Sequence, residues 1–203
     1  MERIIAHIDM NSYFASVEQQ ANPLLRGKAL GVCAYLHEQG CIIAASIEAK
    51  RQGMKVGMTL KEAREVVPGA KFIQNDPTKY RSVTKRIFAI FRQVTDKMEP
   101  YSIDEAFLDM TGWCRDEAEA AFLLTQIKER IREEIGEWLP CSIGIASTKF
   151  LAKVASERQK PNGLTVIRFH ELDTFYATLD LEDFPGIGKR MRRQLWRLGI
   201  FAP

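Results

Sequence analysis

The 203-residue sequence has few cysteines, and their spacing fits neither a metal site nor a disulfide framework. The four cysteines include no CxxC pair, and apart from His37, between Cys33 and Cys41, the histidines stand far from them in the sequence. Zinc ligands and disulfide-forming cysteines usually recur at short, regular spacings. The sequence therefore argues against a zinc site and favours a protein that resides in the reducing cytosol.

Long apolar runs are also missing. No window approaches the roughly 20 apolar residues that a membrane-spanning helix needs, and the apolar run in MERIIAHIDM is too short for the core of a signal peptide. Internal repeats and low-complexity tracts are absent as well. We therefore expect a cytoplasmic protein with no membrane partner.

No large excess of one charge is present either. A formal net charge of +3 permits a nucleic-acid partner without arguing strongly for one. With 46% hydrophobic residues, the chain is long enough for one or two domains with packed cores. Local clusters of residues must therefore indicate the function.

Strand and helix signals follow one another in mixed order. Residues 4–10 alternate, with Ile5, His7 and Asp9 on one face, and predict a strand that ends in an acid. Asn11 or Ser12 can cap the helix that follows. The further expected elements are apolar runs at 30–34 and 42–45, helices at 59–67 and from Pro77 to about Val94, a strand at 101–110, a helix whose stripe runs from Leu124 to Trp138, a strand at 142–146, a helix at 148–159, a strand at 164–168 and a helical module at 169–200. This order predicts an α+β sheet with helices on one side.

The acids Asp104 and Glu105 stand near the beginning of an apolar strand. An ionised carboxylate in an apolar site needs a cationic partner, and a divalent metal is one such partner. Neighbouring side chains of a regular strand point to opposite faces, so both acids reach one site only if the strand begins in an irregular turn. Otherwise Glu105 faces solvent and Asp104 caps a turn, and Asp9 alone is equally ambiguous.

The combination of motifs is more informative than any one of them. The chain contains, in order, HIDMNSYFASVE, YSIDEAFLDM, SIGIASTKFLAKVASERQKPNG and DFPGIGKRMRRQLWRLGI. In order and spacing these segments resemble the Y-family DNA polymerases, most closely the DNA polymerase IV (DinB) branch. The resemblance implies a polymerase palm, a mixed sheet backed by helices, at 1–12 and 78–167. It also implies a small fingers insert at 13–77 and, at 168–203, the start of a helical thumb with one helix-hairpin-helix.

The resemblance further implies template-directed, low-fidelity addition of deoxynucleotides to a primer 3'-end, with translesion synthesis as the expected role. Two magnesium ions would be held by Asp9, Asp104 and Glu105, with the backbone carbonyl of Met10. Hard oxygen ligands of this kind suit magnesium. The expected partners are primer-template DNA and deoxynucleoside triphosphates. The family continues through the rest of the thumb and a little finger, so the sequence is a fragment or a naturally short protein, and a sliding clamp would be contacted through that absent region.

Four residues correspond to the family's nucleotide site. Phe14 occupies the sugar-gate position, where an aromatic ring beneath the deoxyribose excludes a 2'-hydroxyl, although its helical spacing also suits a core residue. Tyr13 would offer a backbone amide to the phosphates. Lys160 matches a phosphate-contacting lysine, and Lys50 stands where the family commonly has arginine.

The triphosphate site also departs from the family pattern. Ile47 and Lys50 replace the Tyr and Arg of a YEAR motif, and Ala44 stands where a Thr hydroxyl is often found. Ile47 cannot donate a hydrogen bond, and lysine lacks the planar fork that arginine offers to phosphate. We therefore expect weaker nucleotide binding.

The last motif predicts a DNA-binding hairpin. Gly186 and Gly188 would let backbone amides approach a phosphate at a helix N-terminus. The cationic side chains that follow, with no acid between them, are Lys189, Arg190, Arg192, Arg193 and Arg197. A basic helix face can simply be solvated, but the PGIG turn favours sequence-independent DNA binding.

Two other functions remain open at this point. A catalytically weak or inactive polymerase-like DNA-repair accessory protein would explain Ile47 and Lys50, whereas retention of the three acids argues against it. Another palm-based phosphotransfer enzyme, such as a nucleotide cyclase, would share the fold. A cyclase, however, would not need the DNA-binding hairpin.

Overall fold

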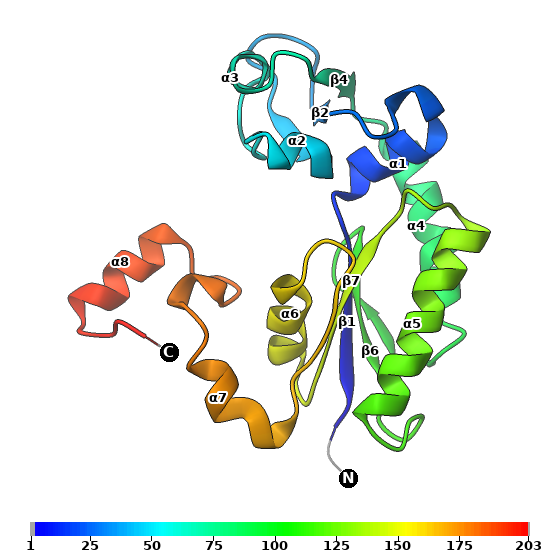
Figure 1. The fold of residues 1–203 in the computed structure, drawn as a ribbon, viewed down its shortest axis with the longest axis vertical. Helices are drawn as coiled ribbons and strands as arrows, with labels where there is room; N and C mark the ends of the chain where they lie inside the picture. The colour runs from blue at the N-terminus through cyan, green and yellow to red at the C-terminus, as the bar shows by residue number, and fades with distance from the viewer. Residues whose placement is uncertain (1–2, 203) are drawn as a thin grey trace.

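A five-stranded mixed sheet forms the centre of the protein (Figure 1). The computed structural model describes residues 3–202, apart from the side chain of Phe169. Across the sheet the strands are β5 (Met98–Pro100), β6 (Glu105–Asp109), β1 (Ile5–Met10), β7 (Cys141–Ala146) and β8 (Leu164–Val166). Neighbouring strands are antiparallel except β7 and β8, which are parallel. This mixed sheet with its helices confirms the predicted α+β class.

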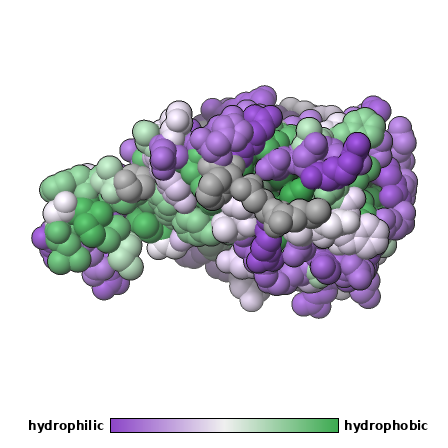
Figure 2. All heavy atoms as spheres, turned by 90° about the horizontal axis from the view of Figure 1, so that it is seen from below, coloured by the Kyte–Doolittle hydropathy of each residue, from purple (hydrophilic) through white to green (hydrophobic). Residues whose placement is uncertain are grey.

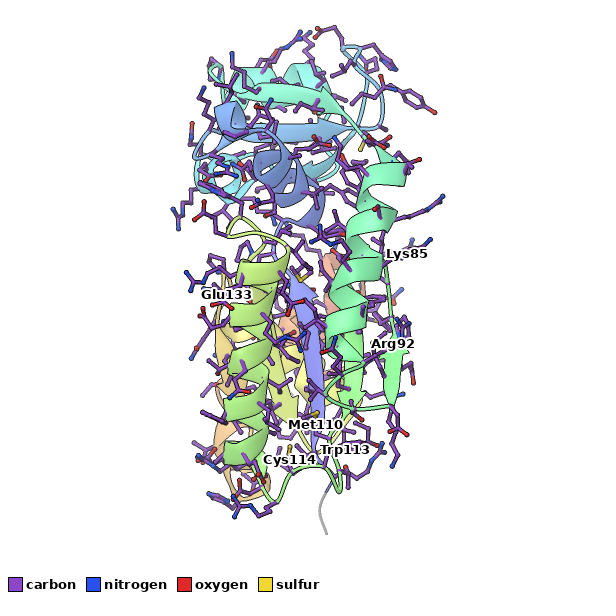
Figure 3. All side chains as sticks on the ribbon, turned by 90° about the vertical axis from the view of Figure 1, so that its right-hand side faces the viewer. Lys85, Arg92, Met110, Trp113, Cys114 and Glu133 are labelled. Atoms are coloured by element: carbon purple, nitrogen blue, oxygen red, sulfur yellow. The ribbon has the colours of Figure 1, made fainter. Side chains whose placement is uncertain are left out.

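Helices cover both faces of this sheet, so the expectation of helices on one side is wrong. Helices α4 (Pro77–Phe91) and α5 (Glu117–Glu134) lie side by side on one face (Figure 3), and α6 (Lys149–Arg158) covers the other. The alternation in β1 follows these layers, because Ala6 and Ile8 pack toward α4 and α5 while Ile5 packs toward α6. Helix α6 meets the sheet largely through alanines, which leave a weak apolar stripe in the sequence.

Close contact between α6 and β7 depends on Gly144. A Cβ atom at this position would lie 2.0 Å from the carbonyl oxygen of Ala152 and 2.4 Å from the backbone nitrogen of Ser156. Such distances are far below van der Waals contact, so only glycine lets the helix lie this near the strand. The approach matters for the site because α6 carries side chains that reach the acids of the sheet.

A second, three-stranded sheet lies beyond the end of β1, at the top of Figure 1. Its strands, in spatial order, are β3 (Ile42–Ala45), β2 (Leu30–Cys33) and β4 (Lys71–Gln74). Around it lie α1 (Tyr13–Ala21), the 3-10 turn η1 (Pro23–Leu25), α2 (Ile47–Arg51) and α3 (Leu60–Val66). This part has a core of its own, built from residues such as Met54 and Leu60. Thr59 and Glu62 form a capping box that starts α3 at the predicted place.

Two local expectations differ from the structure. Ser12 is the N-cap of α1, but its φ of 51° is left-handed and its side chain makes no cap hydrogen bond. Asn11 also does not cap the helix, since its Oδ1 accepts from the backbone nitrogen of Asn162 at 2.7 Å. Helix α5 ends at Glu134 rather than reaching Trp138, because Gly136 has a φ of 155° and packs against Gln20.

The final segment is a chain of short helices beside α6. It contains η2 (Phe169–Glu171), α7 (Leu172–Tyr176), η3 (Leu181–Asp183) and α8 (Lys189–Arg197). Figure 2 shows apolar surface at the end of the molecule where Figure 1 places α8, and the exposed apolar residues there include Trp196, Leu198 and Phe201. Among residues 3–202, no helix is both long enough and apolar enough to cross a membrane.

Candidate active site

The three predicted acids lie on β1 and at the start of its neighbour β6. Asp9 is the second-last residue of β1, and its Cα partner across the β1–β6 pair is Glu105. Asp104 lies in the bend just before β6, where its carbonyl accepts from the backbone nitrogen of Met10 at 3.0 Å. The strand therefore begins in a bend at Asp104, which is the condition under which both adjacent acids could reach one site.

Asp9 and Asp104 open into one cleft of about 630 Å³. The cleft lies between the end of the five-stranded sheet and the three-stranded sheet. Its lining residues are Asp9, Met10, Asn11, Ser12, Tyr13, Phe14, Ile43, Ala44, Ala45, Ile47, Lys50, Arg51, Val56, Asp104, Lys160 and Pro161. The structure therefore brings two acids and all four of the predicted nucleotide-site residues to one place.

Glu105 points to a different set of partners. Its Oε2 lies 2.9 Å from Nε2 of the fully buried His7, and it also accepts from Nζ of Lys153. His7 is held in turn by Ser156, whose Oγ lies 2.8 Å from Nδ1. Burial favours the neutral acid, but the hydrogen bonds from His7 and Lys153 outweigh it and lower the pKa of Glu105 to about 2. Glu105 is thus an ionised neighbour of the cleft rather than one of its lining residues.

Cationic side chains line the same cleft as the two acids. Nζ of Lys160 lies 2.9 Å from Oδ1 of Asp9 and 2.7 Å from Oε1 of Glu157. Burial raises the pKa of Asp9, while the adjacent Lys160 opposes that rise. Burial also lowers the pKa of Lys50, and repulsion from Lys160 adds to this effect. The cleft therefore combines carboxylates with cations, a mixture that suits a ligand carrying both a metal ion and phosphates.

Phe14 is half-buried and lines the cleft from the first turn of α1. Its ring stacks on that of Tyr80, with centroids 4.4 Å apart and an interplanar angle of 13°. Tyr13 is buried, and its hydroxyl donates to the carbonyl of Tyr80 at 2.9 Å. Burial raises the pKa of the Tyr13 phenol to about 12, so this group is a neutral hydrogen-bond donor. Phe14 therefore has one packed face and one side toward the cleft.

The three departures from the family pattern lie where they can affect a ligand. Ala44, Ile47 and Lys50 all line the cleft. Ile47 and Lys50 belong to the five-residue helix α2, whose N-cap Ser46 accepts from the backbone nitrogen of Ala49 at 3.2 Å. Arg51 follows in the same helix and also lines the cleft, although it belongs to none of the sequence motifs described above. The two adjacent cations Lys50 and Arg51 were the feature of the sequence that could have indicated Arg51 as a cleft residue.

With the side chains in their present positions, only two of the three predicted acids, Asp9 and Asp104, could share a metal ion. Within residues 3–202, no three His, Cys, Asp or Glu side chains gather as a ready-made metal site. The carboxylates of Asp9 and Asp104, with Met10 lining the same cleft, fit the oxygen chemistry that magnesium prefers. Glu105 would have to leave His7 and Lys153 to join them.

The predicted hairpin lies beside α6, on the side away from the sheet (Figure 1). Gly186 has a φ of 91°, a left-handed conformation that favours glycine, and Gly188 is the N-cap of α8. Lys189, Arg190 and Arg193 are exposed. Arg192 instead donates to Glu182 at 2.9 Å and lies over the ring of Trp196. A second cleft of about 710 Å³ separates this turn from α6.

Comparison with known proteins identifies the family. Residues 8–157 match the impB/mucB/samB family. The chain belongs to this family. The DNA polymerase IV proteins of Staphylococcus aureus strains JH9 and Newman are 40% and 39% identical to this impB/mucB/samB protein over 200 residues. Membership therefore confirms the resemblance to the DNA polymerase IV branch of the Y-family.

Solved structures give the same result for the fold of this impB/mucB/samB chain. DinB from Sulfolobus solfataricus has a TM-score of 0.90 at 36% identity, and the insertion ternary complex of the Dbh DNA polymerase has 0.92 at 35%. Each covers 98% of this chain and 58% of the neighbour. The two Staphylococcus aureus relatives are matched over 98% of this chain and 56% of their own length, so the chain spans about half of the curated relatives.

Proposed function

We propose that this chain carries the catalytic centre of a template-directed, low-fidelity DNA polymerase that adds deoxynucleotides to a primer 3'-end. The observation that carries the proposal is the cleft in which Asp9 and Asp104 lie together with Lys50, Lys160 and the ring of Phe14. Family membership and the DNA polymerase IV relatives support the same reaction. Translesion synthesis is the corresponding cellular role.

In this proposal the five-stranded sheet with α4, α5 and α6 is the palm, and the three-stranded sheet with α1, α2 and α3 is the fingers. The helices that follow β8 begin the thumb. The boundaries are those expected from the sequence, 1–12 and 78–167, 13–77 and 168–203. The hairpin of Gly186 and Gly188 is the proposed contact with the DNA backbone.

The acids are the proposed magnesium ligands. Asp9, Asp104 and the carbonyl of Met10 would hold the ions, with Glu105 joining them on release from His7 and Lys153. Magnesium, when bound there, would lower the pKa of the primer hydroxyl and stabilise the leaving pyrophosphate. Lys160 and Lys50 would bind the phosphates, helped by the backbone amide of Tyr13. The retained acids and cations support a catalyst rather than an inactive accessory protein.

A primer-extension assay tests the proposal directly. The protein, a primer-template duplex and magnesium are incubated with each deoxynucleoside triphosphate separately, on four templates that differ only at the first unpaired base. We expect the nucleotide that is added fastest to change with the templating base. Absence of extension, or addition that ignores the template, would contradict the proposed reaction.

A further inference from the structure

The position of the Phe14 ring depends on a hydrogen-bonded residue behind it. Phe14 stacks on Tyr80 of α4, which is 1% exposed. The Tyr80 hydroxyl donates to Oε1 of Glu18 at 2.9 Å. Glu18 lies four residues after Phe14 in α1, on the same side of that helix. A direct path of contacts therefore runs from Glu18 through Tyr80 to Phe14.

Burying the Glu18 carboxylate costs free energy, which indicates that the residue has a specific structural role. Its side chain is buried, at 4% exposure, where an ionised carboxylate loses most of its hydration. Nζ of Lys79 donates to its two oxygens at 3.0 and 2.9 Å, and the Tyr80 hydroxyl completes the set. Buried ion pairs of this kind often add little stability compared with apolar packing, but they can specify one arrangement of the groups around them.

Tyr80 is also fixed at its main chain. Its carbonyl accepts from the hydroxyl of Tyr13 at 2.9 Å. The hydroxyl of Thr84, one turn later in α4, donates to the carbonyl of Ile103 at 2.7 Å, next to the bend that presents Asp104. The main chain is thus tied to the bend that carries Asp104, whereas the hydroxyl at the free end of the Tyr80 ring is held by Glu18, with the backbone of Asp76 also beside it.

We propose that Glu18 is a positioning residue for sugar selection: through the Tyr80 hydroxyl it fixes the ring on which Phe14 stacks, and so fixes the distance between Phe14 and the nucleotide sugar. This inference rests on the proposed polymerase function. Loss of the Glu18–Tyr80 bond lets both rings shift, and the space that excludes a 2'-hydroxyl becomes less well defined.

The test compares Glu18→Ala, Glu18→Gln and Tyr80→Phe with Thr95→Val. Tyr80→Phe keeps the stacked ring and removes only the hydroxyl. Glu18→Gln keeps an acceptor for Tyr80. Thr95→Val is the matched control, because it also removes one buried hydroxyl, which donates to the Asp109 carbonyl at 2.9 Å away from the cleft. The measured quantity is the ratio of kcat/KM for a deoxynucleotide to that for the matching ribonucleotide on one primer-template.

We expect Glu18→Ala and Tyr80→Phe to lower this ratio about tenfold, Glu18→Gln to restore most of it, and Thr95→Val to leave it unchanged. In a Phe14→Ala background, Glu18→Ala should have no further effect on the ratio, because the two residues act through one path. An unchanged ratio in Tyr80→Phe, or additive effects in the double variant, would overturn the inference even if Glu18→Ala failed to fold. If the wild type adds no nucleotide at all, the proposed function fails, and the inference fails with it.

Discussion

Asp9 and Glu105 are directly opposite each other across the β1–β6 pair, yet their carboxylates have different partners. Asp9 pairs with Lys160 at 2.9 Å, whereas Glu105 pairs with His7 and Lys153. The two acids therefore differ in their accessibility to a ligand. Asp9 shares the cleft with Asp104, and Glu105 does not.

Asp9→Ala and Asp104→Ala should each reduce primer extension to less than a tenth of the wild-type rate, an effect of more than about 1.4 kcal/mol. Each change removes a carboxylate from the proposed magnesium site. Asp109→Asn is the matched control, because Asp109 lies on the same strand as Glu105 but pairs with Arg3 at the other end. Single-nucleotide incorporation by the three variants is the measurement. An alanine variant that is as active as Asp109→Asn would exclude the metal assignment.

Phe14→Ala should raise ribonucleotide incorporation far more than it lowers deoxynucleotide incorporation. The change deletes the ring that would lie beneath C2' of the sugar. Steady-state kinetics with paired nucleotides on one template measure the ratio. A parallel fall in both activities, with an unchanged ratio, would identify Phe14 as a core residue.

Arg51→Ala should raise the KM for the incoming nucleotide by about tenfold or more, because hydrogen bonds to charged groups contribute roughly 1.5–3 kcal/mol. Arg51 lines the cleft together with Lys50, and it has the planar guanidinium fork that lysine lacks. Arg64→Ala serves as the control, since Arg64 pairs with Glu38 and lies over Phe72, outside the cleft. Equal KM values for the two variants would exclude Arg51 from the phosphate site.

The double change Ile47→Tyr with Lys50→Arg should lower the KM for the nucleotide by about tenfold or more, because it adds a hydroxyl donor and a planar fork to the cleft. The value of kcat should rise as well if the fork tightens on the transition state. Steady-state incorporation at saturating DNA is the measurement. Unchanged constants would mean that Lys160 and Arg51 already satisfy the phosphates.

Combined replacement of Lys189, Arg190 and Arg193 by glutamine should weaken DNA binding and flatten its salt dependence. Each lost phosphate contact should reduce the slope of log K against log salt by about one. Arg192 is left in place because it pairs with Glu182 within the hairpin. Lys85→Gln is the control, as Lys85 is exposed on α4, on the face of the sheet opposite α6 (Figure 3). An unchanged slope in the triple variant would exclude the hairpin from the DNA contact.

Much of the site could be predicted because its signals are local. The alternation of Ile5, His7 and Asp9 gave the face of β1, and the adjacent acids required the bend at Asp104. Long-range contacts left no such signal. Nothing in the sequence around Lys153 indicates that it reaches Glu105, 48 residues away.

The missed elements are short or depend on their neighbours. Strands β4 and β5 have four and three residues, and helix α2 has five, so none contains enough turns or alternations to show a period. Strand β5 ends in Pro100 and lies at the sheet edge, where proline is tolerated. The layer formed by α6 was missed because alanines and Gly144, rather than large apolar residues, make its contact with the sheet.

The close approach of α6 to β7 at Gly144 therefore also determines the positions of charged side chains that Gly144 does not contact. Ser156 and Lys153, on the helix that Gly144 admits, hold His7 and Glu105, and the same helix leads to Lys160 beside Asp9. A methyl group at residue 144 would push that helix away from the sheet. Lys153 would then move away from Glu105, and Lys160 would move away from Asp9. The pairing of charges at the cleft thus depends on one uncharged contact, and a neutral substitution there would change it without altering any acid or base.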